Sequence, residues 1–284
     1  MAKLLKGIDC ANRISEELMP EIQALKASGV NPCLAILRIG ENPDDLAYER
    51  GIEKRFAKLD LSIKKFVLDA GASQDAVLQA IDEINGDDSL QGALLFRPFP
   101  KEMDDELIRN ALRPEKDLDG ISDGSLAGIF TNSKQGFAPC TPEACVALLK
   151  HYGYEIAGKN ITVLGRSLVI GKPVSMMLLN EHASVTICHS KTKEIREHCK
   201  RADIVIGAIG KAEFIDGSFV GRDQVFLDVG INVDAEGKLL GDIKLDEVEA
   251  AAEAISPVPG GVGSITTSIL ASHLVEACKR NIKS

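Results

Sequence analysis

The chain has 284 residues, of which 45% are hydrophobic and 26% charged, and its formal net charge is -9 at pH 7. This composition is typical of a soluble globular protein, and the length allows two ordinary domains. The negative charge argues against a nucleic-acid partner. A run of about 18 apolar residues and the apolar core of a signal peptide are both absent, so we expect a cytoplasmic protein with no membrane partner.

The first half of the chain alternates helical and strand patterns. Apolar periodicity and capping residues predict helices over 8–27, 44–59, 73–85, 104–112 and near 125, and strands over 33–39, 61–68 and 92–96. This alternation predicts a parallel α/β sheet with right-handed connections. Residues 131–139 are polar and rich in turn formers, and they form a candidate hinge.

The second half repeats the alternation. We predict helices over 141–152, 193–200 and 263–282, and strands over 161–164, 184–188, 203–208 and 225–229. The scattered cysteines and histidines lack the spacing of a metal site or a disulfide framework. We therefore predict free thiols and no metal.

A glycine-rich loop follows the strand over 161–164. It contains Gly165, Arg166, Ser167 and Gly171, and Pro173 suits the first turn of the next helix. Glycine permits the abrupt turn, and the free N–H groups at the start of a helix suit a pyrophosphate. The spacing is not the three-glycine fingerprint, so an ordinary strand–turn–helix connection is the alternative.

The end of the next strand bears on the choice of cofactor. An acidic residue there would bind the ribose hydroxyls of NAD, and none stands between Ser184 and Lys193. Arg166 together with Ser190 and Lys191 could bind the extra phosphate of NADP. Solvated surface charge is the alternative interpretation.

Five motifs stand in order along essentially the whole chain, and together they point to one family. They are Lys116–Gly120, Pro139–Pro142, Gly165–Ser167, Asp228–Asn232 and Pro257–Gly263. In this combination the chain resembles the bifunctional methylenetetrahydrofolate dehydrogenase/methenyltetrahydrofolate cyclohydrolase family.

The resemblance implies two α/β domains flanking a cleft that holds folate, with the C-terminal helix returning to the first domain. We expect residues 1–138 plus 265–284 to form the folate-binding catalytic domain and residues 139–264 to form the Rossmann-type parallel sheet. The resemblance also implies NADP as cofactor, a role in one-carbon metabolism and purine biosynthesis, and a homodimer.

The resemblance assigns the site residues as well. Tyr48 would stack on or flank the pterin, and Asp119 would accept hydrogen bonds from its amino-pyrimidine edge, so both are candidate catalytic residues. A half-buried core aromatic and a turn residue are the alternatives for these two. The other candidate substrate-binding residues are Pro259, Gly260 and Gly261. The candidate cofactor-binding residues are Gly165, Arg166, Ser167, Gly171, Ser190, Lys191 and Ile231.

Two departures from the family pattern concern hydrolysis. The family has a lysine four residues after the tyrosine, where this chain has Ile52, and a glutamine where it has Phe96. Lys54 lies about 200° around the helix from Ile52, and Arg97 alternates to the opposite strand face. Because the lysine–glutamine pair supplies the acid–base chemistry of hydrolysis, we predict weak or absent cyclohydrolase activity.

Other readings remain open. A fully bifunctional enzyme could use Lys54, Glu53 or Arg97 after a local shift. A non-catalytic folate- or nucleotide-binding regulator is the alternative from a different class of protein.

Overall fold

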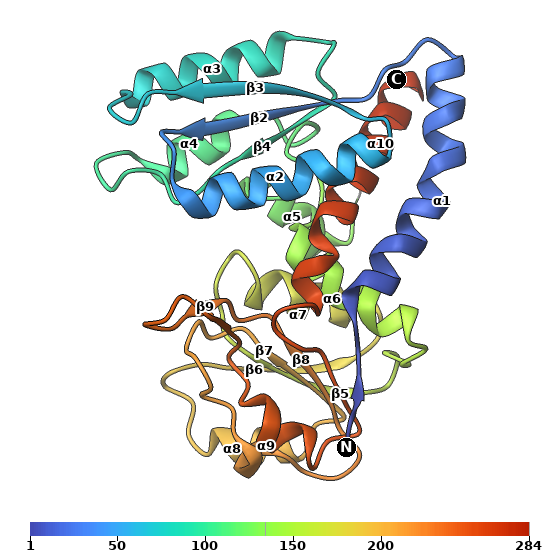
Figure 1. The fold of residues 1–284 in the computed structure, drawn as a ribbon, viewed down its shortest axis with the longest axis vertical. Coiled ribbons are helices and arrows are strands. Elements are labelled where there is room, and N and C mark those ends of the chain that lie inside the picture. The colour runs from blue at the N-terminus through green and yellow to red at the C-terminus, as the bar shows by residue number, and fades with distance from the viewer. Residues whose placement is uncertain (134, 284) are drawn as a thin grey trace. The chain divides into compact units, whose positions relative to one another are not determined.

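The computed structural model describes residues 1–133 and 135–283, which form two compact α/β units (Figure 1). The first unit comprises Arg13–Cys140 and the chain from Thr267 onward, and the second comprises Met1–Asn12 with Thr141–Thr266. The predicted two-domain α/β fold is therefore confirmed, as is the return of the last helix to the first unit. The helices that belong partly to each unit are α1 (Gly7–Ala27), α6 (Cys140–His151) and α10 (Thr266–Lys283).

The elements of the first unit are β2 (Cys33–Ile39), α2 (Pro43–Lys58), β3 (Ser62–Leu68), α3 (Gln74–Gly86), β4 (Gly92–Leu95), α4 (Asp105–Ala111) and α5 (Asp123–Thr131). The strands form a parallel sheet in the order β3-β2-β4. Ala35 and Leu37 point to one face, where they join a buried cluster with Val77 of α3. The contact between Tyr48 and Phe96 places α2 on the opposite face.

The elements of the second unit are β1 (Lys3–Leu4), β5 (Asn160–Leu164), α7 (Gly171–Asn180), β6 (Ser184–Cys188), α8 (Ile195–Lys200), β7 (Ile204–Gly207), η1 (Gly217–Phe219), β8 (Val225–Asp228), β9 (Asn232–Val233), β10 (Leu239–Leu240), α9 (Leu245–Glu249), β11 (Ala254–Ile255) and η2 (Val262–Ser264). A parallel sheet in the order β1-β11-β8-β7-β5-β6 forms its centre. Strands β9 and β10 form a separate antiparallel hairpin. The strand order is that of a Rossmann-type sheet extended by β11 and β1.

Two details differ from the sequence-based expectations. Strand β1 pairs with β11, so Met1–Asn12 belong to the second unit rather than to the first domain, where we had placed them. Helix α2 begins at Pro43, one residue before the predicted start at 44, and its N-cap is Asn42, whose side chain accepts a hydrogen bond from the Asp44 N–H. Asn42 takes this place because Pro43 supplies the first helical residue.

The predicted hinge over 131–139 lies between α5 and α6. Asn132 ends α5 in a left-handed conformation, with a φ of 53°. Lys134 lies outside the described residues. No helix in the described part of the chain is long and apolar enough to cross a membrane.

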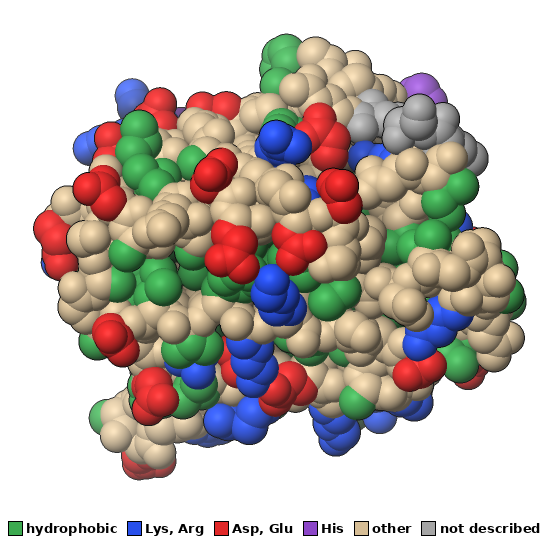
Figure 2. Space-filling view, turned by 90° about the horizontal axis from the view of Figure 1, so that it is seen from above, with side chains coloured by type: hydrophobic (Ala, Val, Ile, Leu, Met, Phe, Trp, Pro, Cys, Tyr) green, Lys and Arg blue, Asp and Glu red, His purple; other side chains and the backbone are tan. Residues whose placement is uncertain are grey.

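Charged side chains of both signs are scattered over the face of the molecule that Figure 2 shows. Acidic and basic groups are interspersed there, with small hydrophobic groups between them. Several ion pairs have two exposed partners, such as Lys64 with Glu83 and Lys150 with Glu181. Such exposed pairs contribute little to stability, so the buried charges of the next section carry more information.

Candidate active site

The glycine loop requires both of its glycines. Gly165 follows β5 with a φ of 132°, and a Cβ there would lie 2.1 Å from the carbonyl oxygen of Ala208. A Cβ on Gly171 would lie 2.3 Å from the carbonyl oxygen of Gly165. Larger residues at either position would therefore collide with backbone and change the path of the loop between β5 and α7.

Helix α7 begins at the end of this loop, as predicted. The Ile170 N–H donates to Oγ of Ser167 over 3.1 Å, and the Lys172 N–H donates to the Ser167 carbonyl oxygen over 3.0 Å. Pro173 occupies the first turn. Ser167 thus shapes the start of the helix, while its neighbour Arg166 is exposed.

The residues assigned to the NADP phosphate gather at one edge of the sheet. Leu164 of β5 and Cys188 of β6 are paired in register. Arg166 and Ser190 each lie two residues beyond this pair, and Lys191 follows. All three side chains are exposed at the carboxyl ends of neighbouring parallel strands, which is where open α/β sheets bind ligands.

Asp228, which ends β8, and Ile231, three residues later, have opposite environments. Ile231 is 72% exposed at the same edge of the sheet, where a cofactor could contact it. Asp228 is buried and accepts hydrogen bonds from the backbone N–H groups of Gly230, Asp242 and Ile243, each over 3.0 Å. Burial nevertheless raises the pKa of Asp228 to about 7, and the nearby charge of Asp242 acts in the same direction.

This raised pKa predicts a pH dependence of stability. The folded protein holds a proton on Asp228 that the unfolded chain releases above about pH 4, so the stabilisation is complete below that pH and is lost as the pH rises to about 7. We expect the melting temperature to fall less steeply for Asp228→Asn than for the wild type between about pH 5 and about pH 8. Thermal denaturation across that range measures both slopes, and equal slopes would contradict the assignment.

Apolar side chains occupy both positions where the family has its lysine–glutamine pair. Ile52 is completely buried on α2, and Phe96 is 8% exposed just after β4. The ring of Tyr48, one helical turn before Ile52, meets the Phe96 ring edge to face, with centroids 5.9 Å apart. The exposed Lys54 lies on a different side of α2, as predicted.

A buried charge cluster, which no pattern in the sequence indicates, lies beside Tyr48. Glu49 is 3% exposed and accepts hydrogen bonds from Nε of Arg38 over 2.9 Å and from Nζ of Lys65 over 2.6 Å. Burial alone would raise the pKa of Glu49, but these hydrogen bonds outweigh it and lower the pKa. The cluster fixes α2 to β2 and β3, and it therefore fixes the backbone that carries Tyr48.

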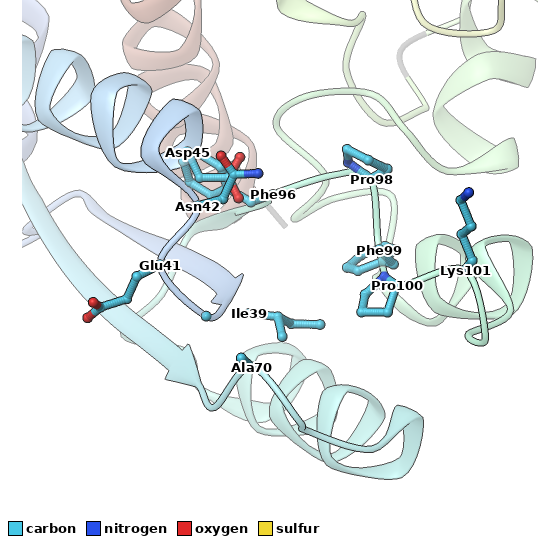
Figure 3. A pocket seen from close by; sticks show the side chains of 11 residues that line it. Ile39, Glu41, Asn42, Asp45, Ala70, Phe96, Pro98, Phe99, Pro100 and Lys101 are labelled. Carbon is cyan, nitrogen blue, oxygen red and sulfur yellow. The ribbon is translucent and has the colours of Figure 1, made fainter.

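A hollow of about 380 Å³ lies at the carboxyl ends of β2, β3 and β4. In Figure 3, Ile39 extends toward Phe99 and Pro100, whereas Glu41 points away. Arg38 also donates to the carbonyl oxygen of Gly40, which connects the charge cluster to this rim. The hollow is lined by Ile39, Gly40, Glu41, Asn42, Asp45, Ala70, Phe96, Pro98, Phe99, Pro100 and Lys101.

Asp119 is half-buried, and its neighbour Asp117 differs from it in role. Oδ1 of Asp119 accepts a hydrogen bond from the Cys140 N–H over 3.2 Å. Burial raises the pKa of Asp119, although the contact with Cys140 opposes the change. Asp117 is buried and accepts from the N–H groups of Ile121 and Ser122, so it holds the turn before α5.

Pro259, Gly260 and Gly261 belong to the second unit, whereas Tyr48 and Asp119 belong to the first. The Gly260 carbonyl oxygen accepts a hydrogen bond from the Gly7 N–H over 2.8 Å, which anchors the loop to the start of α1. Gly260 has a φ of 102° and open space around its Cα. Its exposed backbone is accessible to a ligand, and the gathering of these residues around one substrate stays a proposal.

The fold and the glycine loop define a two-unit α/β protein with a Rossmann-type dinucleotide-binding sheet. Residues 5–119 match the family model for the tetrahydrofolate dehydrogenase/cyclohydrolase catalytic domain, and residues 139–282 match that for the NAD(P)-binding domain of the same family. The chain therefore belongs to the tetrahydrofolate dehydrogenase/cyclohydrolase family.

Individual relatives match over nearly their full lengths. The bifunctional protein FolD of Clostridioides difficile is 47% identical over 277 residues, which is 98% of this chain and 96% of the relative. The structure of the bifunctional enzyme FolD from Campylobacter jejuni has a TM-score of 0.95 at 33% identity and covers 99% of this chain and 100% of its own. The Trypanosoma brucei FolD complexed with NADP and an inhibitor has a TM-score of 0.93 at 30% identity, covering 100% and 99%.

Proposed function

We propose that this protein oxidises 5,10-methylenetetrahydrofolate to 5,10-methenyltetrahydrofolate in one-carbon metabolism, with NADP as the hydride acceptor, and that it hydrolyses the product weakly or not at all. Family membership and the NADP bound to the Trypanosoma brucei relative support the dehydrogenase assignment. One observation carries the second part, namely the buried apolar pair of Ile52 and Phe96.

NADP, when bound, supplies the acceptor for a hydride that leaves the one-carbon bridge. The adjacent folate nitrogens stabilise the resulting cation, so the protein has mainly to orient the substrate, and it needs no acid or base. In this assignment Tyr48 flanks the pterin, and Asp119 accepts hydrogen bonds from its amino-pyrimidine edge. Gly165 and Gly171 let the loop turn tightly beside the site assigned to the pyrophosphate, since a Cβ on either would meet backbone.

Hydrolysis of the methenyl cation differs because a water must be activated and protons must move. Ile52 and Phe96 can do neither. Of the candidate substitutes, Glu53 pairs with Lys65 over 2.5 Å. Arg97 is engaged by both carboxylate oxygens of Asp105. The remaining candidate, Lys54, is exposed on another side of the helix, so the fully bifunctional alternative has weaker support.

The experiment that tests the dehydrogenase assignment is NADP reduction by the purified protein. Reduction should require methylenetetrahydrofolate and should proceed with NADP more efficiently than with NAD. NADP binding without folate-dependent reduction would instead favour the non-catalytic regulator.

Arg166 provides a prediction about cofactor choice. Because a guanidinium can form two charge-assisted bonds to the extra phosphate, Arg166→Ala should lower the NADP/NAD ratio of kcat/KM by about 5- to 100-fold. Arg201→Ala is the matched control, since it removes an exposed arginine before β7, at the opposite edge of the sheet. Steady-state kinetics with both cofactors measures the ratio, and an unchanged ratio in Arg166→Ala would refute the assignment.

We also propose a cytoplasmic homodimer, on the strength of the family resemblance. Sedimentation of the purified protein tests the oligomeric state. A monomer at working concentration would contradict that part of the proposal.

A further inference from the structure

Asp242 is completely buried, and four N–H donors converge on its carboxylate. Oδ2 accepts from the backbone N–H groups of Ile209, over 2.5 Å, and Gly210, over 3.0 Å. Oδ1 accepts from the Lys211 N–H over 2.8 Å and from Nδ2 of Asn232 over 3.1 Å. One side chain thereby orients three successive amides of the loop after β7 and also the start of β9.

This loop adjoins the glycine loop. Strands β5 and β7 are neighbours in the sheet, and the Ala208 N–H donates to the Leu164 carbonyl oxygen over 2.8 Å. The Ala208 carbonyl oxygen lies only 2.1 Å from the position that a Cβ on Gly165 would take. The segment 209–211 therefore continues the surface of the glycine loop along the carboxyl edge of the sheet, where a dinucleotide binds in such folds.

Asp242 is itself held in place. The Asp242 N–H donates to Oδ1 of Asp228, at the end of β8, over 3.0 Å. Two glycines make room for the two carboxylates, since a Cβ on Gly241 would lie 1.8 Å from Oδ2 of Asp228 and one on Gly230 would lie 2.3 Å from Cγ of Asp242. The network joins the ends of β7, β8 and β10, so these loops hold one geometry together.

We propose that Asp242 is a positioning residue for the dinucleotide: its carboxylate orients the segment 209–211 as a wall of the cofactor site next to the glycine loop. This proposal rests on the proposed function, because it takes the carboxyl edge of the second unit as the NADP site. Asp242 acts through the loop and not by contact with the cofactor.

The chemistry of the carboxylate explains why the aspartate matters. Each of its oxygens accepts two hydrogen bonds, which only a carboxylate can do at both positions. In Asp242→Asn an NH₂ group would face two N–H donors and leave them without an acceptor. The segment 209–211 would then lose its fixed orientation while the strands on either side kept their pairing.

The test is NADP affinity in the absence of folate, measured by calorimetry on Asp242→Asn. We expect Kd to rise by about tenfold or more, whereas the folate KM at saturating NADP should stay within about twofold of the wild-type value. Asp234→Asn is the matched control, because Asp234 also accepts backbone N–H bonds, from Glu236 and Lys238, but lies in the exposed β9–β10 hairpin. Its NADP Kd should be unchanged.

Two outcomes would overturn the proposal. One is a wild-type NADP Kd in folded Asp242→Asn. The other is a lower fraction of active protein with an unchanged NADP KM, which indicates a purely structural role. If Asp242→Asn does not fold, Asn232→Ala removes one donor from the carboxylate and should raise the Kd by about threefold; an unchanged Kd there would also refute the proposal. The proposed function fails separately, if the wild type binds NADP but does not oxidise methylenetetrahydrofolate.

Discussion

The double variant Ile52→Lys with Phe96→Gln should hydrolyse methenyltetrahydrofolate about 100-fold or more faster than the wild type, because general acid–base catalysis typically contributes about 10² to 10⁴. Ile52 lies one helical turn after Tyr48 on α2. Phe96 contacts the Tyr48 ring. An ammonium group and an amide there would supply the proton transfer that the present side chains lack.

Controls separate chemistry from packing. The double variant Ile52→Met with Phe96→Met introduces flexible chains without polar groups, and it should gain no hydrolysis. Ile52→Lys alone should lower stability, since it places an unpaired charge at a completely buried position. Dehydrogenase activity should persist in part in all three variants. No hydrolysis in a folded lysine–glutamine variant would show that the site lacks more than this pair.

The second large effect is expected at Asp119. Asp119→Asn should lower kcat/KM for methylenetetrahydrofolate by about 5- to 150-fold, because an amide replaces one acceptor of the pterin edge by a donor and costs about 1–3 kcal/mol. The Cys140 N–H already donates to Oδ1, so the NH₂ group would take the place of Oδ2, which the proposed function assigns to the pterin edge. The NADP Kd measured without folate should not change.

Asp117→Asn is the control for this substitution. Asp117 lies two residues away and accepts bonds from Ser122 and Ser125, so its loss should lower the melting temperature without a specific rise in the folate KM. The raised pKa of Asp119 adds a second check: as the pH falls through that pKa, the carboxyl group becomes protonated and the wild-type folate KM should rise. A pH-independent KM, or loss of NADP affinity in Asp119→Asn, would mean that this residue is structural.

Local patterns predicted most of the fold. The apolar runs that form β2, β5 and β6 end at glycine or polar residues, and the periodicity of α1 and α10 is plain in the sequence. The short strands β1 and β11 escaped prediction because each has only two residues and they pair across about 250 positions of sequence. Because of this pairing, Met1–Asn12 belong to the second unit and not to the first domain.

The candidate site was predictable only where it follows motifs. Gly165 and Gly171 form the tight turn, and Pro173 lies in the first turn of α7, as local chemistry predicts; their part in cofactor binding stays a prediction. Glu49 and Asp242 gave no signal, because the partners that keep these carboxylates buried come from other strands or from backbone amides of distant loops. Buried charges of this kind are determined by tertiary contacts, and no periodicity in the sequence encodes them.

The most direct test of the account follows NADPH and methenyltetrahydrofolate together in one reaction of the wild-type protein with methylenetetrahydrofolate and NADP. Our account predicts one methenyl product for each NADPH formed, decaying only at the rate seen without protein, because Ile52 and Phe96 offer no acid or base. Rapid loss of the methenyl absorbance at undiminished NADPH production would contradict it. If Lys54→Met then abolished that loss, Lys54 would be the base of a fully bifunctional enzyme.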